Sequence, residues 1–216
     1  MNKKFLQNFQ QRIITGTLFG ALYGGILLFL PPIYFSLLLL ITLGIILIFE
    51  WPNFFTPSSL PFWLLMPFYP VAPFLCLIEI NQTNQPLIFL MLAMVFCFDT
   101  GAYLAGNIFG VHKLWPTISP GKTWEGFFGG YCCALITFLL LDAGYLHFSF
   151  SLPFAALLTG ITCIFSTAGD LFESWLKRKA GIKDSGNLLP AHGGFLDRFD
   201  GLLFVAVLFS ILQALI

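Results

Sequence analysis

Charge is scarce in this sequence. Only 9% of its 216 residues are Asp, Glu, Lys or Arg, 58% are hydrophobic, and the formal net charge is zero. Soluble globular proteins carry roughly 25% charged residues, so a water-soluble fold of this length would lack the polar side chains needed to cover its surface. The net charge of zero gives no overall attraction to nucleic acid, and we therefore expect no nucleic-acid partner.

The sequence also lacks the cysteine patterns of zinc sites and disulfide frameworks. None of its cysteines has CxxC spacing or a nearby histidine, and all of them lie in apolar runs. We expect small buried or lipid-facing residues at these positions. They are Cys76, Cys97, Cys132, Cys133 and Cys163.

The sequence instead contains long runs of apolar residues. Seven stretches are long enough to cross about 30 Å of hydrocarbon, which predicts an all-α, polytopic transmembrane helical bundle of about seven membrane helices. We expect one integral membrane domain over residues 1–216. The third stretch contains four prolines and is expected to be kinked or broken. The stretches are 13–30, 33–49, 60–78, 86–109, 126–147, 152–177 and 199–216.

The basic residues predict the orientation in the membrane. Every Lys and Arg lies before the first stretch, after the fourth, or from the end of the sixth to the start of the seventh, and seven helices place all three groups on one side. Towards the opposite side lie Glu79 and Asp142, but no Lys or Arg. Because cytoplasmic loops carry the excess of Lys and Arg, we expect the N-terminus on the cytoplasmic side and the C-terminus outside.

Asp99 is an acid well inside the fourth stretch. A charged side chain at the centre of a membrane helix costs about 2.5–3.5 kcal/mol on insertion scales, so it normally faces a polar interior. Two interpretations follow, a contact to substrate or ion and a structural hydrogen bond to a neighbouring helix.

The segment 116–126 precedes the fifth stretch and contains Gly121-Lys122-Thr123. These residues resemble the end of a Walker A loop, but Pro116 stands where that motif needs glycine and no strand is expected before it, which excludes a P-loop NTPase. What remains is a turn that presents hydroxyls and a lysine at a helix N-terminus, where a phosphate is favoured. A membrane-surface anchor through Lys122 is the alternative.

The stretch from Gly169 to Asp200 holds ten of the chain's twenty charges. Its separated carboxylates are ligands of the kind Mg²⁺ prefers, its Lys and Arg side chains can neutralise phosphates, and Gly193-Gly194 lets the backbone approach a ligand closely. Metal-assisted phosphoryl or nucleotidyl transfer requires this combination. A solvated basic loop on anionic headgroups would explain the bases but not the acids at the helix ends.

Three clusters in this stretch keep a fixed spacing. They are Ser174-Trp175-Leu176-Lys177-Arg178, Lys183-Asp184, and His192-Gly193-Gly194-Phe195-Leu196-Asp197-Arg198-Phe199-Asp200. The pattern resembles the signature of the phosphatidate cytidylyltransferase family, also called CDP-diacylglycerol synthases. Two earlier segments resemble further family motifs in the expected order, so that the region from about residue 99 to residue 216 carries the motifs. These are Asp99-Thr100-Gly101-Ala102-Tyr103 and Ser119-Pro120-Gly121-Lys122-Thr123-Trp124-Glu125.

The resemblance implies a reaction of phosphatidic acid with CTP that gives CDP-diacylglycerol and pyrophosphate. It also implies Mg²⁺, with a K⁺ ion proposed beside it, held by Asp170 and Asp197. The residues expected to act on the phosphates or as lesser metal candidates are Lys177, Arg178, Lys183, Asp184, Arg198 and Asp200. The residues expected to contact substrate are Asp99, Ser119, Lys122, Thr123, Ser174, His192, Gly193 and Gly194.

Other membrane-protein classes fit the sequence less well. The DGxxAR…GxxxDxxxD pattern of CDP-alcohol phosphotransferases is absent. A secondary transporter would suit Asp99, but its sites would lie near the midplane in two similar halves, whereas here the charges crowd one side. The expected partners are CTP, phosphatidic acid and the lipid bilayer, with a homodimer as an open alternative, in the plasma membrane of a bacterium.

Overall fold

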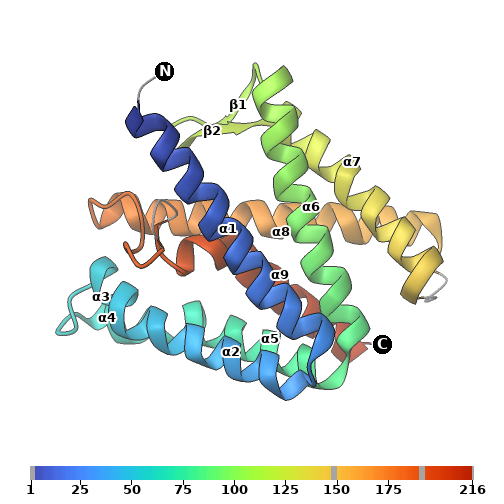
Figure 1. Ribbon diagram of the computed structural model, residues 1–216, viewed down its shortest axis with the longest axis horizontal. Helices are drawn as coiled ribbons and strands as arrows, with labels where there is room; N and C mark the ends of the chain where they lie inside the picture. The colour runs from blue at the N-terminus through green and yellow to red at the C-terminus, as the bar shows by residue number, and fades with distance from the viewer. Residues whose placement is uncertain (1–2, 147–149, 190–192, 216) are drawn as a thin grey trace. The chain divides into compact units, whose positions relative to one another are not determined.

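The computed structural model describes residues 3–146, 150–189 and 193–215, and helices dominate it (Figure 1). Each of the seven predicted stretches coincides with a helical segment, although residues 147 and 216, which end two of the predicted stretches, lie outside the described residues. Within the described ranges, six segments are long and apolar enough to cross a membrane, and the apolar part of the first helix, Thr15–Phe29, is shorter. The prediction of a polytopic helical membrane protein is confirmed. The six segments are Pro32–Phe54, Leu60–Thr83, Gln85–Phe109, Trp124–Gly144, Leu152–Lys179 and Leu196–Leu215.

The chain divides into two compact units, which are described separately. The first comprises Met1–Thr83 and Leu176–Phe199, and the second comprises Asn84–Trp175 and Asp200–Ile216. The expectation of a single membrane domain is not tested by this division and stays a prediction.

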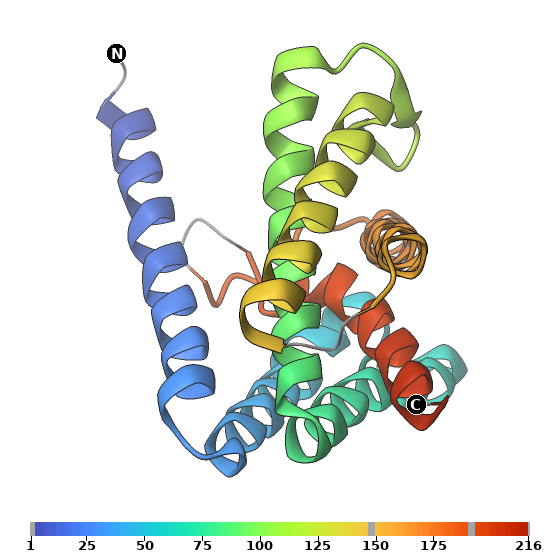
Figure 2. The ribbon, with the colours of Figure 1, turned by 90° about the vertical axis from the view of Figure 1, so that its right-hand side faces the viewer.

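The first unit contains the helices before Asn84. They are α1 (Lys3–Phe29), α2 (Pro32–Ile45), the π-helical turn η1 (Ile46–Glu50), α3 (Trp51–Phe54), α4 (Leu60–Leu65), the π-helical turn η2 (Pro67–Val71) and α5 (Ala72–Thr83). Helices α2 and α5 lie side by side (Figures 1 and 2). The Asn81 side chain of α5 joins them, because its Nδ2 donates to the Pro32 carbonyl oxygen at 2.7 Å and to Ser36 Oγ at 2.9 Å.

The proline-rich third stretch is broken, as predicted. Tyr69, which precedes Pro70, leaves the helical conformation with φ −153° and ψ 111°. A residue before proline is driven towards extended backbone, because the proline ring clashes with the helical form. The helix therefore restarts as α5 after this point.

The second unit is built on α6 (Gln85–Phe109) and α7 (Trp124–Leu141), which pack against each other. Glycines permit their close approach, since a Cβ on Gly130 would lie 2.6 Å from the Phe98 carbonyl oxygen and one on Gly126 would lie 2.7 Å from that of Ala102. The π-helical turn η3 (Asp142–Leu146) follows α7, and α8 (Leu152–Lys179) and α9 (Leu196–Leu215) each contribute residues to both units.

A short antiparallel hairpin joins α6 to α7, at one end of the two helices (Figure 1). Its strands are β1 (Lys113–Trp115) and β2 (Ser119–Thr123), with Lys113 opposite Thr123 and Trp115 opposite Ser119. The expectation of a turn with no strand was wrong here, because strands this short, with Pro120 and Gly121 in one of them, leave no alternating pattern to recognise. The expected helix N-terminus is confirmed, since Thr123 Oγ1 accepts from the N–H of Gly126 at 3.1 Å and caps α7.

Candidate functional site

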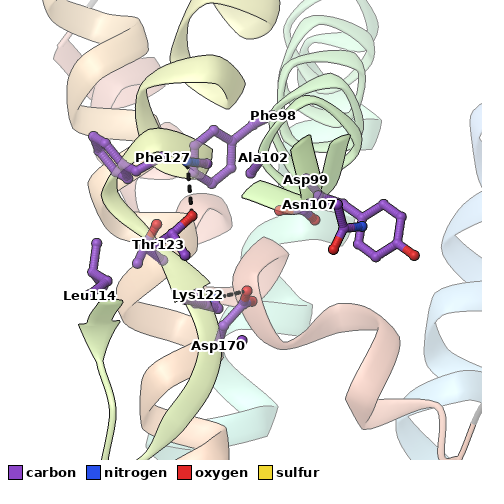
Figure 3. A pocket seen from close by; sticks show the side chains of 13 residues that line it. Phe98, Asp99, Ala102, Asn107, Leu114, Lys122, Thr123, Phe127 and Asp170 are labelled. Atoms are coloured by element: carbon purple, nitrogen blue, oxygen red, sulfur yellow. Dashed lines mark hydrogen bonds and ion pairs between the residues drawn. The ribbon is translucent and has the colours of Figure 1, made fainter. Parts of the chain in front are cut away.

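A cavity of about 330 Å³ opens in the second unit beside the hairpin. It is bounded by α6, the end of β2, the first turn of α7, and α8 (Figure 3). Most of its lining is apolar, and its polar side chains come from α6, from the end of β2 and from α8. The lining residues are Phe98, Asp99, Ala102, Tyr103, Asn107, Leu114, Gly121, Lys122, Thr123, Gly126, Phe127, Thr167 and Asp170.

Lys122 and Asp170 form an ion pair in this cavity (Figure 3). Their side chains are 28% and 20% exposed, so both charges reach the open space. The sequence predicts Lys122 as a phosphate contact and Asp170 as a metal ligand, and the structure adds that each is the other's partner. A salt bridge between two partly exposed side chains is weak. An incoming phosphate can therefore compete for Lys122, and an incoming cation can compete for Asp170.

Asp170 lies where two helices of this unit come close together. A Cβ on Gly201 of α9 would lie 2.6 Å from Asp170 Oδ1, and one on Gly169 of α8 would lie 2.4 Å from the Asp200 carbonyl oxygen. Only glycine leaves room for this contact. The Asp200 carboxyl group itself accepts from the N–H of Gly201 at 2.9 Å.

Asp99 lines the cavity from α6, with Asn107 two turns further along (Figure 3). Asp99 thus faces a cavity that also holds the charged side chains of Lys122 and Asp170, while the expectation of a polar interior stays a prediction. Whether it contacts a substrate or serves the structure stays open.

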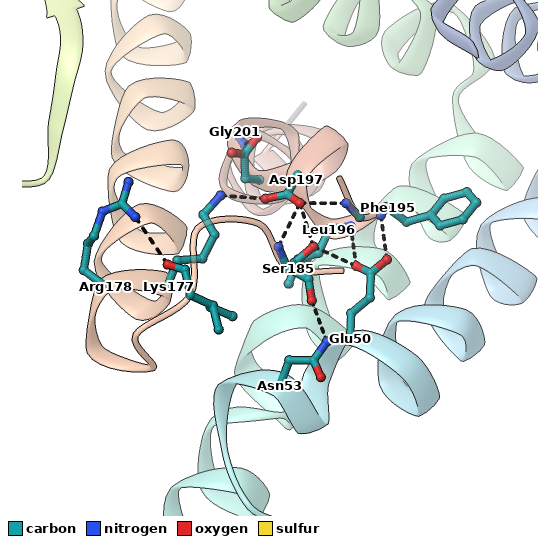
Figure 4. Close-up of polar contacts among 12 residues, drawn as sticks. Glu50, Asn53, Lys177, Arg178, Ser185, Phe195, Leu196, Asp197 and Gly201 are labelled. Carbon is teal, nitrogen blue, oxygen red and sulfur yellow. Dashed lines mark hydrogen bonds and ion pairs between the residues drawn. The ribbon is translucent and has the colours of Figure 1, made fainter. Parts of the chain in front are cut away.

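Asp197 is the centre of a polar network in the first unit (Figure 4). Its Oδ1 lies 2.6 Å from Lys177 Nζ. Its Oδ2 accepts from the N–H and the hydroxyl of Ser185, both at 2.9 Å, and from the N–H of Gly194 at 2.8 Å. The predicted metal ligand is thus held by one cation and by three hydrogen-bond donors from the stretch between Gly169 and Asp200, which we call the signature stretch. We call these residues, together with Glu50, the Asp197 network.

The segment that carries this network is closed by turns. Gly181, with φ +72°, follows the end of α8, where the N–H of Ile182 donates to the Lys177 carbonyl oxygen at 3.0 Å. Gly193, with φ +84°, exchanges two backbone hydrogen bonds with Leu189. Glycine is favoured at such backbone angles, which explains two of the glycines in the stretch.

Glu50 is a functional candidate that the sequence did not reveal. It lies at the end of η1 and is fully buried. Its oxygens accept from the N–H groups of Phe195 and Leu196, and Oε2 lies 3.0 Å from the Ser185 hydroxyl oxygen. An acid directly after an apolar run was the available signal, weaker than that of Asp99, which lies well inside such a run.

The remaining predicted site residues that the structure describes lie outside the cavity and outside the Asp197 network. Arg178 is exposed and its Nη1 donates to the Ile182 carbonyl oxygen at 3.3 Å, while Lys183, Asp184 and Arg198 are also exposed. Ser119 and Ser174 are half-buried, and His192 lies outside the described residues. Their proposed roles stay predictions.

Asp170 and Asp197 belong to different units, so a shared metal ion stays a prediction as well. Among the residues that the structure describes, no three His, Cys, Asp or Glu side chains gather as they would around a metal held by protein alone. Mg²⁺ does not require such a group, because it is usually held by one or two carboxylates together with water and substrate phosphates.

Known proteins resemble this chain over most of its length. The phosphatidate cytidylyltransferase of Staphylococcus saprophyticus is 42% identical over 160 residues, which cover 74% of this chain and 61% of the relative. That of Staphylococcus haemolyticus is 50% identical over 119 residues, which cover 55% of this chain and 45% of the relative. The chain thus spans less than two thirds of the length of these curated relatives.

A protein-family model also matches most of the chain. The model described as the cytidylyltransferase family matches residues 34–216, which include most of α2, every later element as far as α9, and both groups of polar residues. The chain belongs to the cytidylyltransferase family.

Proposed function

We propose that this integral membrane protein is a phosphatidate cytidylyltransferase, which transfers CMP from CTP to phosphatidic acid and releases pyrophosphate. The observation that carries the proposal is the Lys122–Asp170 pair in the cavity beside the hairpin. The cation can bind the phosphates of a nucleoside triphosphate, and the carboxylate facing the same open space can bind its metal ion.

The reaction can be written with the groups at hand. An oxygen of the lipid phosphate attacks the α-phosphorus of CTP, a new P–O bond forms, and the bond between the α-phosphorus and the pyrophosphate oxygen breaks. The lipid phosphate is already ionised at neutral pH, so no side chain is needed as a general base. The protein then contributes positioning and neutralisation of charge.

The donor set fits Mg²⁺ at Asp170. Its carboxyl group reaches the cavity and forms an ion pair with Lys122. A hard cation can take the place of that lysine, with phosphate oxygens as its further ligands. Asp197 fits less directly, because Oδ2 accepts three hydrogen bonds and Oδ1 faces Lys177. A bound Mg²⁺ would supply Lewis-acid stabilisation of the phosphate charge, and a K⁺ ion beside it is part of the same proposal.

The basic side chains of the signature stretch have the complementary role. Lys177 is buried against Asp197, whereas Arg178 near the end of α8, Lys183 in the loop that follows, and Arg198 in the first turn of α9 are exposed. We assign the exposed cations to the triphosphate and the lipid phosphate. The cytoplasmic side, where CTP is found, is the side on which the distribution of Lys and Arg places them.

The test is an assay with purified protein, labelled CTP, phosphatidic acid and Mg²⁺. We expect the wild-type chain to make CDP-lipid, and we expect this product to be absent when a chelator is added. Glu79→Ala should behave in the same way, because Glu79 is an exposed acid outside the cavity and outside the Asp197 network. Asp197→Ala is expected to be inactive. Well-folded wild-type protein that makes no CDP-lipid would contradict the function, and activity that survives in Asp197→Ala would contradict the role of this residue alone.

A further inference from the structure

Glu50 is an acid buried within a membrane-spanning segment. It is 0% exposed and lies near the end of the apolar segment Pro32–Phe54. Placing a carboxyl group there is costly unless its oxygens are satisfied by donors. Its presence therefore calls for an explanation beyond packing.

The donors to Glu50 come from the start of α9. The N–H of Phe195 donates to Oε1 at 2.7 Å and the N–H of Leu196 donates to Oε2 at 2.8 Å. The first N–H groups of a helix have no partners within that helix, and the helix dipole favours a negative group at this end. Glu50 thus caps α9 from a position 145 residues earlier in the chain.

Glu50 also reaches Asp197 through one hydroxyl group. Ser185 Oγ lies 3.0 Å from Glu50 Oε2 and 2.9 Å from Asp197 Oδ2 (Figure 4). The hydroxyl has a single proton, so it can donate to one carboxylate at a time, while the Ser185 N–H holds Asp197 independently. Asn53, three residues after Glu50, donates to the Ser185 carbonyl oxygen at 2.8 Å.

The signature glycines are shaped around the same side chain. A Cβ on Gly194 would lie 2.7 Å from Glu50 Cδ, and one on Gly186 would lie 3.0 Å from Glu50 Cγ. The backbone on both sides of the turn therefore lies directly against the glutamate. Any larger residue at Gly194 would push Glu50 away from its donors.

We infer that Glu50 is the positioning residue of the Asp197 network: it fixes the segment from Ser185 to Leu196 so that Asp197 and Lys177 face each other. The effect of Glu50 passes through Ser185 and the start of α9. The consequence for catalysis rests on the proposed cytidylyltransferase function. The structural part does not.

The test compares Glu50→Gln with Glu79→Gln, the same substitution at an exposed acid. A glutamine keeps the size of the side chain but presents an NH₂ group to an N–H donor, so at least one of the three hydrogen bonds is lost. We expect the amides of Phe195 and Leu196 to exchange with deuterium about tenfold faster in Glu50→Gln. We also expect kcat to fall by about 100-fold, because a displaced active-site group costs rate rather than folding. Glu79→Gln is expected to match the wild type in both measurements.

Glu50→Asp is the second variant, in case Glu50→Gln does not fold. It keeps the buried carboxylate but is one methylene too short, so intermediate exchange and an intermediate kcat are expected. Wild-type exchange at Phe195 and Leu196 in either variant would overturn the inference, and so would a loss of kcat with unchanged exchange. If the wild type makes no CDP-lipid, the proposed function fails, while the exchange measurement still decides the role of Glu50.

Discussion

Lys177 Nζ lies 2.6 Å from Asp197 Oδ1, and the two side chains are only 11% and 5% exposed. The sequence predicts the lysine for a phosphate and the aspartate for a metal ion. In the structure each charge is neutralised by the other. The pair is therefore part of the framework of the signature stretch, and a ligand must compete with it to reach either residue.

Loss of this lysine should destabilise the protein. In Lys177→Met, Asp197 stays buried without its cation, and breaking a buried pair in this way costs about 3 kcal/mol. A clear fall in Tm in detergent solution is the expected result. Lys179→Met, an exposed lysine two positions further along the same helix, is the control. Equal Tm values for the two variants would show that the pair contributes nothing.

Gly194 is expected to tolerate no side chain. A Cβ there would lie 2.1 Å from Ser185 Oγ, and the Gly194 N–H also holds Asp197. Overpacking of this kind costs about 1–3 kcal/mol, so Gly194→Ala should unfold at a lower temperature and lose activity. Gly44→Ala in α2, where nothing lies within 4 Å of the new Cβ, should be at least as stable as the wild type. A Gly194→Ala protein with wild-type Tm and activity would refute the packing argument.

Asp170 should set the metal dependence of the reaction. In Asp170→Asn the side chain keeps its size but loses the charge that attracts a hard cation. Activity should fall by about 100-fold, and the Mg²⁺ concentration for half-maximal activity should rise. Asp142→Asn, at the far end of α7, is the matched control. An unchanged Mg²⁺ dependence in Asp170→Asn would remove Asp170 from the metal site.

The orientation can be measured by labelling from one side of the membrane. Single cysteines at Lys183→Cys and Glu79→Cys, in a background without the five native cysteines, replace two exposed residues. An impermeant thiol reagent added to intact cells should label the cysteine at position 79 and spare the one at position 183, because Lys and Arg mark the cytoplasmic side. The reverse pattern would place the signature stretch outside.

The membrane helices could be predicted because each depends on a local run of apolar residues. Stretches such as 86–109 have the length that the hydrocarbon core requires, and the structure forms α6 over Gln85–Phe109. The hairpin of β1 and β2 could not be predicted in the same way. Its strands have three and five residues, too few for an alternating pattern to stand out.

The chemistry of single residues was also visible in the sequence, but their partners were not. Lys122 was identified from its place at a helix N-terminus, and the resemblance to a known family singled out Asp170 and Asp197. Their contacts join positions such as 122 and 170, which no local pattern connects. Glu50 went unassigned for the same reason, since it acts on residues 145 and 146 positions away.

The position of the label in CTP tests the central claim most directly. Purified protein is given phosphatidic acid, Mg²⁺ and CTP labelled either at the α-phosphate or at the γ-phosphate. If the chain is a phosphatidate cytidylyltransferase, the α-label appears in the lipid, the γ-label appears in pyrophosphate, and the two products form in equal amounts. Transfer of the γ-label to lipid, or release of label without any CDP-lipid, would contradict the account.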